Sequence, residues 1–349
     1  MRVVQYGCFG TKNYGDEESA RVVRELVSAA FPETPVEFSL VGVDATFAAR
    51  AHPGVAFVQE QDKQAVRTLC QGAEVLIYGP GTVVGSTTMP SIPEILQTAI
   101  SVVIWGAGAN PVSPGSIGDQ LVKRASYVSL RDKGSQAYVL PYRPDAQVVG
   151  DPMLYDTWGV VLTPSRQAVD LSFSLTYQTP DVKERVYSAV AEATIQLGGA
   201  WVGLPASWEP TKWVSWDDDR PVMEPLCHRV PFEIVTPANF RGLSNQLLHC
   251  SGLLTSRLHT GVFVLGNGGN AVLFGPNKMR FMAEELGCPA KYAGVYETLT
   301  AEALVRAWKA PLPETKRLTC LRASARDASL MRTALERALR DRRVPPVAQ

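Results

Sequence analysis

The sequence has no run of about 20 apolar residues, the length that a helix needs to cross a lipid bilayer. Its six cysteines are scattered, without a CxxC pair or a zinc-ligand spacing, which favours reduced thiols over a disulfide framework or a structural zinc site. The N-terminus does not have the charged and apolar regions of a secretory signal, since it reads as a short strand followed by glycine. These absences predict a cytoplasmic protein.

Net charge and internal repetition are missing as well. Lys plus Arg and Asp plus Glu number 34 each, so no overall positive field would attract nucleic acid, and a nucleic-acid partner is not expected. No segment recurs with a period of about 20 to 50 residues, which excludes a solenoid or a propeller. No carboxylate pair accompanies a histidine at a predicted strand end, so no metal is expected. The acidic run Asp217 to Asp219 is predicted to be a solvated loop.

Short apolar runs that end in glycine are abundant, and they alternate with helical patterns. This alternation is typical of βαβ units and predicts an α/β fold with mainly parallel sheets. Because 349 residues exceed the usual size of one hydrophobic core, we expect two domains, residues 1–158 and 159–349. The terminal helix, about residues 322–343, has an apolar side with which it could pack back on the first domain.

The predicted strands end where glycine or a charged residue begins. In the first domain they lie at residues 2–7, 36–42, 55–59, 73–81, 101–108, 126–132 and 146–152. In the second domain they lie at residues 170–177, 200–206, 232–237, 250–259 and 270–276. The segment 208–219, which is rich in tryptophan and aspartate and has little periodicity, is predicted to be a loop over a cleft.

Three glycine-rich loops follow predicted strands of the first domain. They are "YGCFGTKNYGDEESA", "YGPGTVVGSTT" and "WGAGANP", and none has the GxGxxG or Walker pattern. In parallel sheets, glycine at the carboxyl end of a strand lets the backbone approach a ligand. Three such loops in one sheet favour a ligand site over turn chemistry alone. The first loop contains Gly7, Gly10 and Gly15, with Asn13 and Asp16 as turn or capping residues. The second contains Gly79 and Gly81, with Ser86 and Thr87 as hydroxyl donors, and the third contains Gly106 and Gly108.

Cations also follow predicted strands. Arg131 ends one strand of the first domain, where it suits either a surface ion pair with Asp132 or bidentate capture of a carboxylate or phosphate. In the second domain, Arg257 and His259 follow one strand and Lys278 follows the next. Because successive strand ends lie at the same edge of the sheet, His259 and Lys278 favour an anion site with acid/base capacity.

Several of these motifs resemble those of the polysaccharide pyruvyl transferases. The similar segments are "GTKNYGDE", "YGPG", "WGAGANP", "VSLRDKGS", "GDP" and the long "SRLHTGVFVLGNGGNAVLFGPNKMRFMAEELG". The resemblance implies a glycosyltransferase-B-like architecture, in which two Rossmann-like domains face a cleft. It also implies transfer of pyruvate from phosphoenolpyruvate to hydroxyl groups of a saccharide, free or lipid-linked, which forms a ketal. Phosphoenolpyruvate would be the co-substrate, and no cofactor is expected.

Carried over by position, the resemblance implies roles for individual residues. His259 would be the general acid/base, Arg131 and Lys278 would hold the donor, and Arg257 would organise the strand end or add to the anion site. The remaining donor-site positions would be Gly10, Asn13, Gly79, Gly81, Gly106 and Gly108. Independently of the resemblance, we expect acceptor-site positions at Asp16, at the hydroxyl donors Ser86 and Thr87, and at Trp208 and Trp213, which suit stacking on a sugar.

The sequence departs from this family where Pro80 interrupts its triple glycine and "VVGST" replaces its Gln-Asp pair. A glycosyltransferase with a nucleotide-sugar donor is therefore a second hypothesis, because it uses the same architecture and also needs a diphosphate site. Its acceptor would be a saccharide, a metabolite or a modified nucleobase. A third hypothesis is a non-catalytic protein that binds an anion or a sugar. Stabilisation by phosphoenolpyruvate or by a nucleotide diphosphate would separate the first two.

Overall fold

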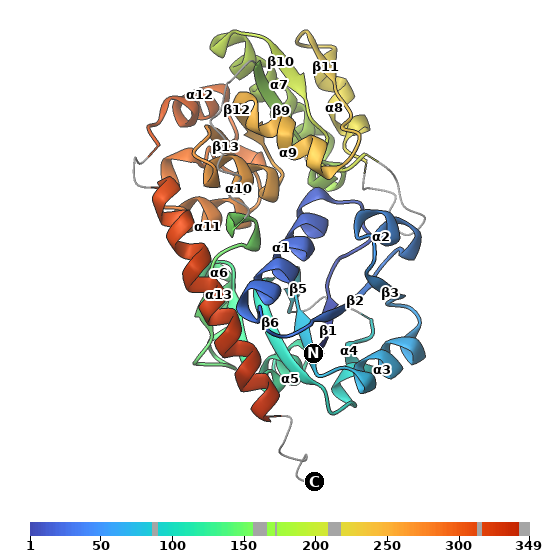
Figure 1. Cartoon of the computed structure of the whole chain (residues 1–349). Helices are drawn as coiled ribbons and strands as arrows, with labels where there is room; N and C mark the ends of the chain where they lie inside the picture. The colour runs from blue at the N-terminus through green and yellow to red at the C-terminus, as the bar shows by residue number, and fades with distance from the viewer. Residues whose placement is uncertain (86–89, 156–165, 172, 209–217, 313–315, 342–349) are drawn as a thin grey trace. The chain divides into compact units, whose positions relative to one another are not determined.

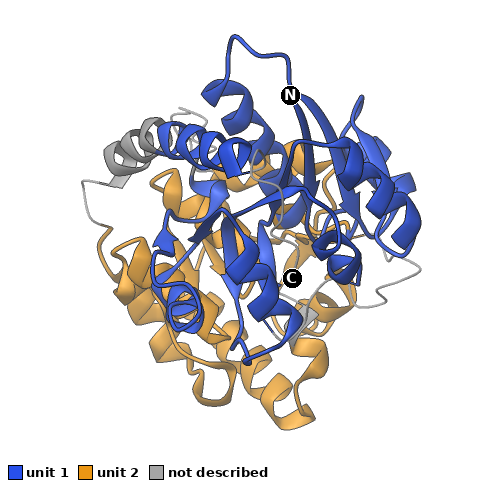
Figure 2. Ribbon diagram, turned by 90° about the horizontal axis from the view of Figure 1, so that it is seen from below, with its two compact units in different colours: residues 1–11, 16–155, 322–349 blue, residues 12–15, 156–321 orange. Residues whose placement is uncertain are grey.

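The computed structural model describes residues 1–85, 90–155, 166–171, 173–208, 218–312 and 316–341 (Figure 1). The chain divides into two compact units (Figure 2). Unit 1 comprises Met1–Thr11, Asp16–Tyr155 and Arg322–Gln349, and unit 2 comprises Lys12–Gly15 and Asp156–Leu321. Within the described ranges, no helix is both long and apolar enough to span a membrane.

Unit 1 is a parallel sheet with helices on both faces. Its strands are β1 (Arg2–Tyr6), β2 (Glu37–Gly42), β3 (Ala56–Gln59), β4 (Val75–Tyr78), β5 (Gly81–Val84), β6 (Ser101–Ala109), β7 (Tyr127–Leu130) and β8 (Gln147–Val148). The main order is β3-β2-β1-β4-β6-β7-β8, and β5 pairs with β6. The helices are α1 (Tyr14–Ala30), whose first two residues belong to unit 2, α2 (Ala45–Ala51), α3 (Lys63–Gly72), α4 (Ile92–Leu96), α5 (Ile117–Arg124), α6 (Lys133–Val139) and the 3-10 turn η1 (Pro152–Tyr155).

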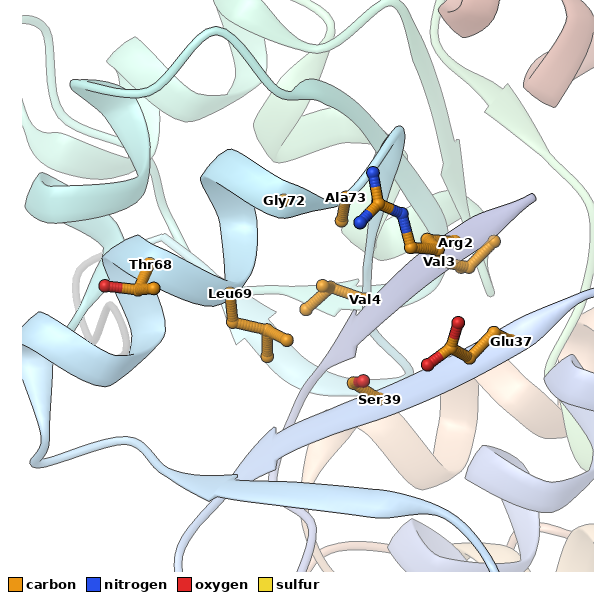
Figure 3. A pocket seen from close by; sticks show the side chains of 9 residues that line it. All are labelled: Arg2, Val3, Val4, Glu37, Ser39, Thr68, Leu69, Gly72 and Ala73. Atoms are coloured by element: carbon orange, nitrogen blue, oxygen red, sulfur yellow. The ribbon is translucent and has the colours of Figure 1, made fainter.

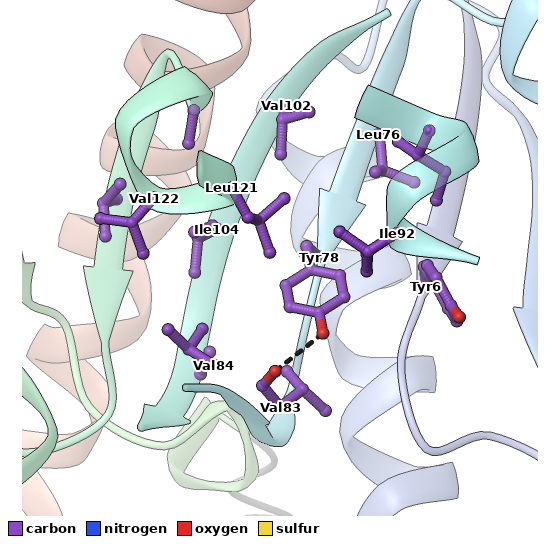
Figure 4. Packing of buried hydrophobic residues seen from close by; sticks show 14 of the residues in the cluster. Tyr6, Leu76, Tyr78, Val83, Val84, Ile92, Val102, Ile104, Leu121 and Val122 are labelled. Atoms are coloured by element: carbon purple, nitrogen blue, oxygen red, sulfur yellow. Dashed lines mark hydrogen bonds between the residues drawn. The ribbon is translucent and has the colours of Figure 1, made fainter. Parts of the chain in front are cut away.

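Alternate residues of each unit 1 strand point to opposite sides, so the continuously apolar strands supply two hydrophobic layers. Leu76 and Tyr78 of β4 face one layer, where the Tyr78 hydroxyl donates to the Val83 carbonyl at 2.8 Å (Figure 4). Val75 and Ile77 face the other layer. The sheet core is therefore buried on both faces.

Helix α13 (Lys316–Asp341) contributes residues 322–341 to unit 1. Its buried side chains join the second layer, together with residues of the sheet and of α1: Met331, Ala334, Leu335 and Ala338. The Arg332 Nε atom donates to the Ala30 carbonyl at 2.6 Å. The terminal helix, predicted to have an apolar side that could pack back on the first domain, thus has that side buried in the core of unit 1.

Unit 2 is a second, all-parallel sheet in the order β11-β10-β9-β12-β13. Its strands are β9 (Arg166–Asp170), β10 (Trp201–Gly203), β11 (Phe232–Ile234), β12 (Cys250–Thr255) and β13 (Ala271–Leu273). Its helices are α7 (Pro180–Leu197), α8 (Arg220–Cys227), α9 (Phe240–Leu248), α10 (Leu258–Gly266), α11 (Asn277–Glu285) and α12 (Ala301–Lys309), with 3-10 turns η2 (Phe173–Tyr177), η3 (Pro289–Lys291) and η4 (Tyr296–Thr298). Two Rossmann-like α/β units, as predicted, are confirmed.

The first strand of unit 2 was predicted in the wrong place. The prediction puts it at residues 170–177, whereas β9 ends at Asp170 and η2 follows. Leu171 and Leu175 are both buried in the unit 2 core. The apolar side chains of Leu171 and Leu175 therefore reach the core from a segment that includes a 3-10 turn.

Candidate functional site

The strand order of unit 2 reverses between β9 and β12, and in open α/β sheets ligands bind at the carboxyl ends of the strands beside such a point. Asp170 ends β9 and Thr255 ends β12. Helices α10 and α11 follow β12 and its neighbour β13, and they begin at this same edge. The predicted residues His259 and Lys278 lie in the first turns of these two helices.

The two helices begin in the same way. His259 is the second residue of α10, and Lys278 is the second residue of α11. Neither first turn contains an acidic residue, and the N-cap residues Arg257 and Pro276 make no side-chain capping hydrogen bond. A cation is unfavourable near the positive end of a helix, whereas an anion is stabilised there by the backbone N–H groups. Two helix N-termini side by side at the end of this sheet, with a lysine in one first turn and a histidine in the other, therefore make this edge suitable for a bound anion.

The segment Lys12–Gly15 belongs to unit 2 and lies against His259. The Tyr14 N–H donates to the Ala206 carbonyl at 3.0 Å, and the Tyr14 and Ser244 hydroxyls are 2.8 Å apart. A Cβ atom added at Gly15 would lie 2.5 Å from the His259 Cβ and closer still to its ring. Glycine is thus required beside the imidazole, a relation that the sequence pattern did not reveal.

The turn before α1 also differs from the sequence interpretation. Asn13 accepts a hydrogen bond from the Gly15 N–H at 3.0 Å. Because α1 begins at Tyr14, Asp16 lies inside its first turn and does not cap it. The predicted first domain, residues 1–158, includes Lys12–Gly15, whereas the structure assigns this segment to unit 2. The segment belongs there because Tyr14 makes its contacts with residues of unit 2.

Arg257 forms a buried ion pair with Asp219. Its Nε donates to Oδ2 of Asp219 at 3.0 Å, and its Nη2 donates to Oδ1. Asp219 Oδ2 also accepts from the N–H groups of Ala206 and Ser207, at 3.0 and 3.1 Å. The prediction of a solvated acidic run is therefore wrong for Asp219, which is 0% exposed. The pair joins the residue before α8 to the residue before α10.

Asp170 links the ends of β9 and β12 to the start of α10. Its Oδ2 accepts from the hydroxyls of Thr260 and Thr255, at 2.7 and 3.2 Å. Burial, and then the nearby carboxylate of Asp219, raise the pKa of Asp170 to about 8. Neither Asp170 nor Asp219 was among the candidates, because both side chains are defined by contacts between distant parts of the sequence.

Asp170 should make the stability of the fold depend on pH. The unfolded chain releases this proton near pH 4 and the folded chain near pH 8, so the free energy of unfolding should fall as pH rises between these values. Between pH 5 and pH 8 the free energy of unfolding should fall for the wild type and fall less for Asp170→Asn. The difference between the two decreases should be on the order of 3 kcal/mol. Urea unfolding at several pH values measures this difference, and parallel curves for the two proteins would contradict it.

In unit 1 the strand order reverses between β1 and β4. The loop after β4 contains Gly79 and Gly81 at φ +113° and +106°, with a cis peptide bond between Gly79 and Pro80. A Cβ atom at Gly81 would lie 3.4 Å from Oδ1 of Asp16. The predicted residues Asp16 and Gly81 therefore face each other at the switch point of this sheet.

Arg131 lies at the carboxyl edge of unit 1 and is 2% exposed. Its Nη2 donates to the Thr82 hydroxyl at 2.8 Å, and its Nε is 3.4 Å from Oδ2 of Asp132. A Cβ at Gly108 would lie 2.6 Å from the same Nη2, so glycine leaves the space that the guanidinium fills. Asp132 caps α6 by accepting from the Ser135 N–H at 2.6 Å.

The remaining candidates have simpler roles or lie outside the described residues. The backbone of Gly106, at φ +57°, packs against Pro152. Trp208 packs on Phe240, with ring centroids 5.2 Å apart. Ser86, Thr87, Trp213 and most of the Trp-rich loop fall in ranges that the structure does not describe. Within the described ranges, no group of three His, Cys, Asp or Glu side chains could hold a metal ion.

A cavity of about 230 Å³ opens in unit 1 beside α3 and the start of β1 (Figure 3). It is lined by Arg2 and Val4 of β1, Glu37 of β2 and Thr68 of α3. These strand residues lie toward the amino ends of β1 and β2, the edge opposite to the glycine loops. Because ligands of parallel sheets bind at the carboxyl edge, this cavity is not the candidate site.

Comparison with known proteins identifies the fold. No family model matches the chain, and neither does any curated protein. Among solved structures, a UDP-GlcNAc 2-epimerase of Methanocaldococcus jannaschii, in complex with UDP-GlcNAc and UDP, has a TM-score of 0.63 at 10% identity and covers 95% of this chain and 99% of its own. The S. aureus MnaA–UDP structure has a TM-score of 0.60 at 12% identity, with 95% and 94% covered. OtsA has a TM-score of 0.57 at 11% identity, with 97% and 98% covered.

Proposed function

We propose that the chain is an enzyme that binds a nucleotide sugar and transfers its glycosyl group to a hydroxyl group. The observation that carries the proposal is the pair of helix N-termini whose N-cap residues make no side-chain capping hydrogen bond, with His259 as the second residue of α10 and Lys278 as the second residue of α11. A diphosphate carries the charge and the oxygens that these N–H groups and the ammonium can bind. Two solved structures of the same fold hold UDP, and one also holds UDP-GlcNAc, which supports this class of donor.

The chemistry of transfer fits the groups at this edge. An acceptor oxygen forms a bond to the anomeric carbon, and the bond from that carbon to the diphosphate breaks. The nucleoside diphosphate leaves with the electron pair, and the acceptor proton passes to a base. Lys278 and the helix N-termini would stabilise the charge that develops on the diphosphate. A ring nitrogen of an imidazole can accept a proton, so His259 is the proposed base for the acceptor hydroxyl.

Pyruvyl transfer from phosphoenolpyruvate is the second candidate, favoured by the "SRLHTGVFVLGNGGNAVLFGPNK" segment that contains His259 and Lys278. A sugar hydroxyl would attack the carbon that bears the phosphate as the methylene is protonated. Phosphate then leaves, and a second hydroxyl closes the ketal. The same cations would bind the carboxylate and phosphate of this donor.

A ligand panel distinguishes the two candidates. We expect UDP to raise the thermal stability of the wild-type protein, since a ligand at 100 times its Kd adds about 2.7 kcal/mol to the stability of the folded state. Phosphoenolpyruvate and inorganic phosphate should have smaller effects. Lys278→Ala should lose most of the UDP shift. Lys309→Ala, which removes the same charge from an exposed position in α12, should retain it.

The opposite ranking, a shift with phosphoenolpyruvate and none with UDP, would replace the first proposal by pyruvyl transfer. A shift with neither compound would overturn both. Where UDP binds, incubation with UDP-N-acetylglucosamine and candidate saccharides separates the reaction types: acceptor-dependent release of UDP indicates glycosyl transfer, whereas an isomerised nucleotide sugar indicates epimerisation.

A further inference from the structure

Three side chains of unit 1 form a buried chain of hydrogen bonds that ends on the first glycine loop. The Nη2 of Arg24 is 2.9 Å from Nδ1 of His52, and Nε2 of His52 is 2.8 Å from Oε2 of Glu17. The other carboxylate oxygen of Glu17 accepts from the Gly10 N–H at 2.7 Å. His52 is 4% exposed and Glu17 is 1% exposed. The chain thus connects α1 and the end of α2 to the loop that follows β1.

The direction of each hydrogen bond follows from the donors available. A guanidinium only donates, so Nδ1 of His52 accepts from Arg24. The proton of a neutral imidazole is then on Nε2, which donates to Glu17. Burial, and next the charge of Arg24, lower the pKa of His52 to about 3, which keeps the ring neutral. The bonds therefore have one consistent arrangement, from Arg24 through His52 to Glu17.

The chain of hydrogen bonds ends at Gly10, in a tightly turned part of the loop that follows β1. Gly10 has φ +76°, and a Cβ there would lie 2.7 Å from the Asp44 carbonyl oxygen. Just beyond it, the Thr11 hydroxyl donates to the Cys8 carbonyl at 2.9 Å and lies 3.5 Å from Oδ2 of Asp16. Asp16 and Glu17 are neighbours in α1, but Glu17 bonds inward to His52 and Gly10 while Asp16 faces Gly81 at the switch point.

We propose that Arg24, His52 and Glu17 are positioning residues which, through Gly10, hold the loop at residues 7–11 and Asp16 in the arrangement that binds a substrate hydroxyl group at the switch point of unit 1. The Asp16 carboxylate and the oxygen of the Thr11 hydroxyl suit the hydroxyl groups of a saccharide, since both oxygens can accept hydrogen bonds from them without adding positive charge. This role rests on the proposed glycosyl transfer. In this proposal Arg24, His52 and Glu17 do not touch the substrate themselves but act through Gly10.

The first readout is the Gly10 amide, and it requires no substrate. In protein labelled with 15N-glycine, we expect amide hydrogen exchange at Gly10 to become about 10 to 100 times faster in His52→Leu, as for the loss of a hydrogen bond to a charged group. His52→Gln can accept from Arg24 and donate to Glu17 through one amide group, so exchange should stay near the wild-type rate. His249→Leu makes the same change at an exposed histidine that directly follows α9 and should leave Gly10 unaffected.

The second readout is the release of UDP from UDP-N-acetylglucosamine in the presence of a saccharide acceptor. His52→Leu should lower kcat about 10-fold or more and leave KM for UDP-N-acetylglucosamine near the wild-type value, because none of the three positioning residues is a proposed donor-binding group, and His52→Gln should restore kcat. If His52→Leu is poorly folded, Glu17→Gln serves instead, since it keeps the side-chain shape but has only one acceptor oxygen. Unchanged Gly10 exchange in these variants would overturn the hydrogen-bond chain, and faster exchange with unchanged kcat would overturn the positioning role. Failure of the wild type to bind UDP would instead count against the proposed function.

Discussion

Replacing Arg257 by alanine is expected to lower the free energy of unfolding by about 3–5 kcal/mol, the cost of removing one partner from a buried ion pair. The Asp219 carboxylate would remain 0% exposed, with two backbone N–H donors and no guanidinium. Burial already raises the pKa of Asp219, and Arg257 is the main group that opposes this. Chemical denaturation at pH 7 measures the loss.

An exposed ion pair of the same unit provides the control. Arg229 pairs with Glu184 at 2.7 Å, with side chains that are 31% and 63% exposed. Solvent screens such a pair, so Arg229→Ala should change stability far less than Arg257→Ala. Adding Asp219→Asn to Arg257→Ala should recover part of the loss, because it removes the unpaired charge. Equal losses in the two alanine variants would show that the Arg257 pair does not stabilise unit 2.

A methyl group at Gly15 is expected to lower kcat/KM for UDP-N-acetylglucosamine by roughly 100-fold, the effect of displacing a reacting group by about 1 Å. Gly15→Ala places a Cβ where the His259 side chain lies, so the imidazole has to move. Tyr14 holds the backbone of Lys12–Gly15 in unit 2, and this is what brings Gly15 close to His259. Activity measurements and the NMR signals of the four histidines, assigned by substitution, report the change.

Gly242→Ala is the matched control. Gly242 also lies in the first turn of a helix, α9, but its added Cβ would meet its nearest neighbour at 3.5 Å, an ordinary contact distance. It should therefore leave the His259 signal and the activity near wild-type values. A Gly15→Ala protein with an unshifted His259 signal and full activity would show that the imidazole is not placed by this segment.

Much of the fold could be predicted from local sequence. Apolar runs that end in glycine locate most strands of both sheets, and the positions of His259 and Lys278 after successive runs indicate one sheet edge. These features depend on residues close together in the sequence. The strand predicted at residues 170–177 is wrong, because the apolar residues Leu171 and Leu175 are buried from the segment after β9, in which Phe173–Tyr177 forms the 3-10 turn η2.

The features that escaped prediction depend on partners far apart in the sequence. Asp219 looked like part of a solvated acidic run, and only its contact with Arg257, 38 residues away, shows that it is buried. Glu17 and His52 are separated by 35 residues, and nothing in either segment indicates their hydrogen bond. The sequence places Gly15 in a glycine loop that favours a ligand site, but it does not indicate that the backbone of Gly15 lies against His259. Such contacts follow from topology, which local patterns do not specify.

Calorimetric titration of UDP into the wild-type protein and into Lys278→Ala tests most directly whether the N-termini of α10 and α11 bind a nucleotide diphosphate. We predict measurable binding to the wild type and an affinity at least about 10-fold lower for Lys278→Ala, equivalent to roughly 1.4 kcal/mol. Lys309→Ala should bind UDP as the wild type does. Absence of UDP binding to the wild type, or equal affinities for the wild type and Lys278→Ala, would contradict the proposed donor site.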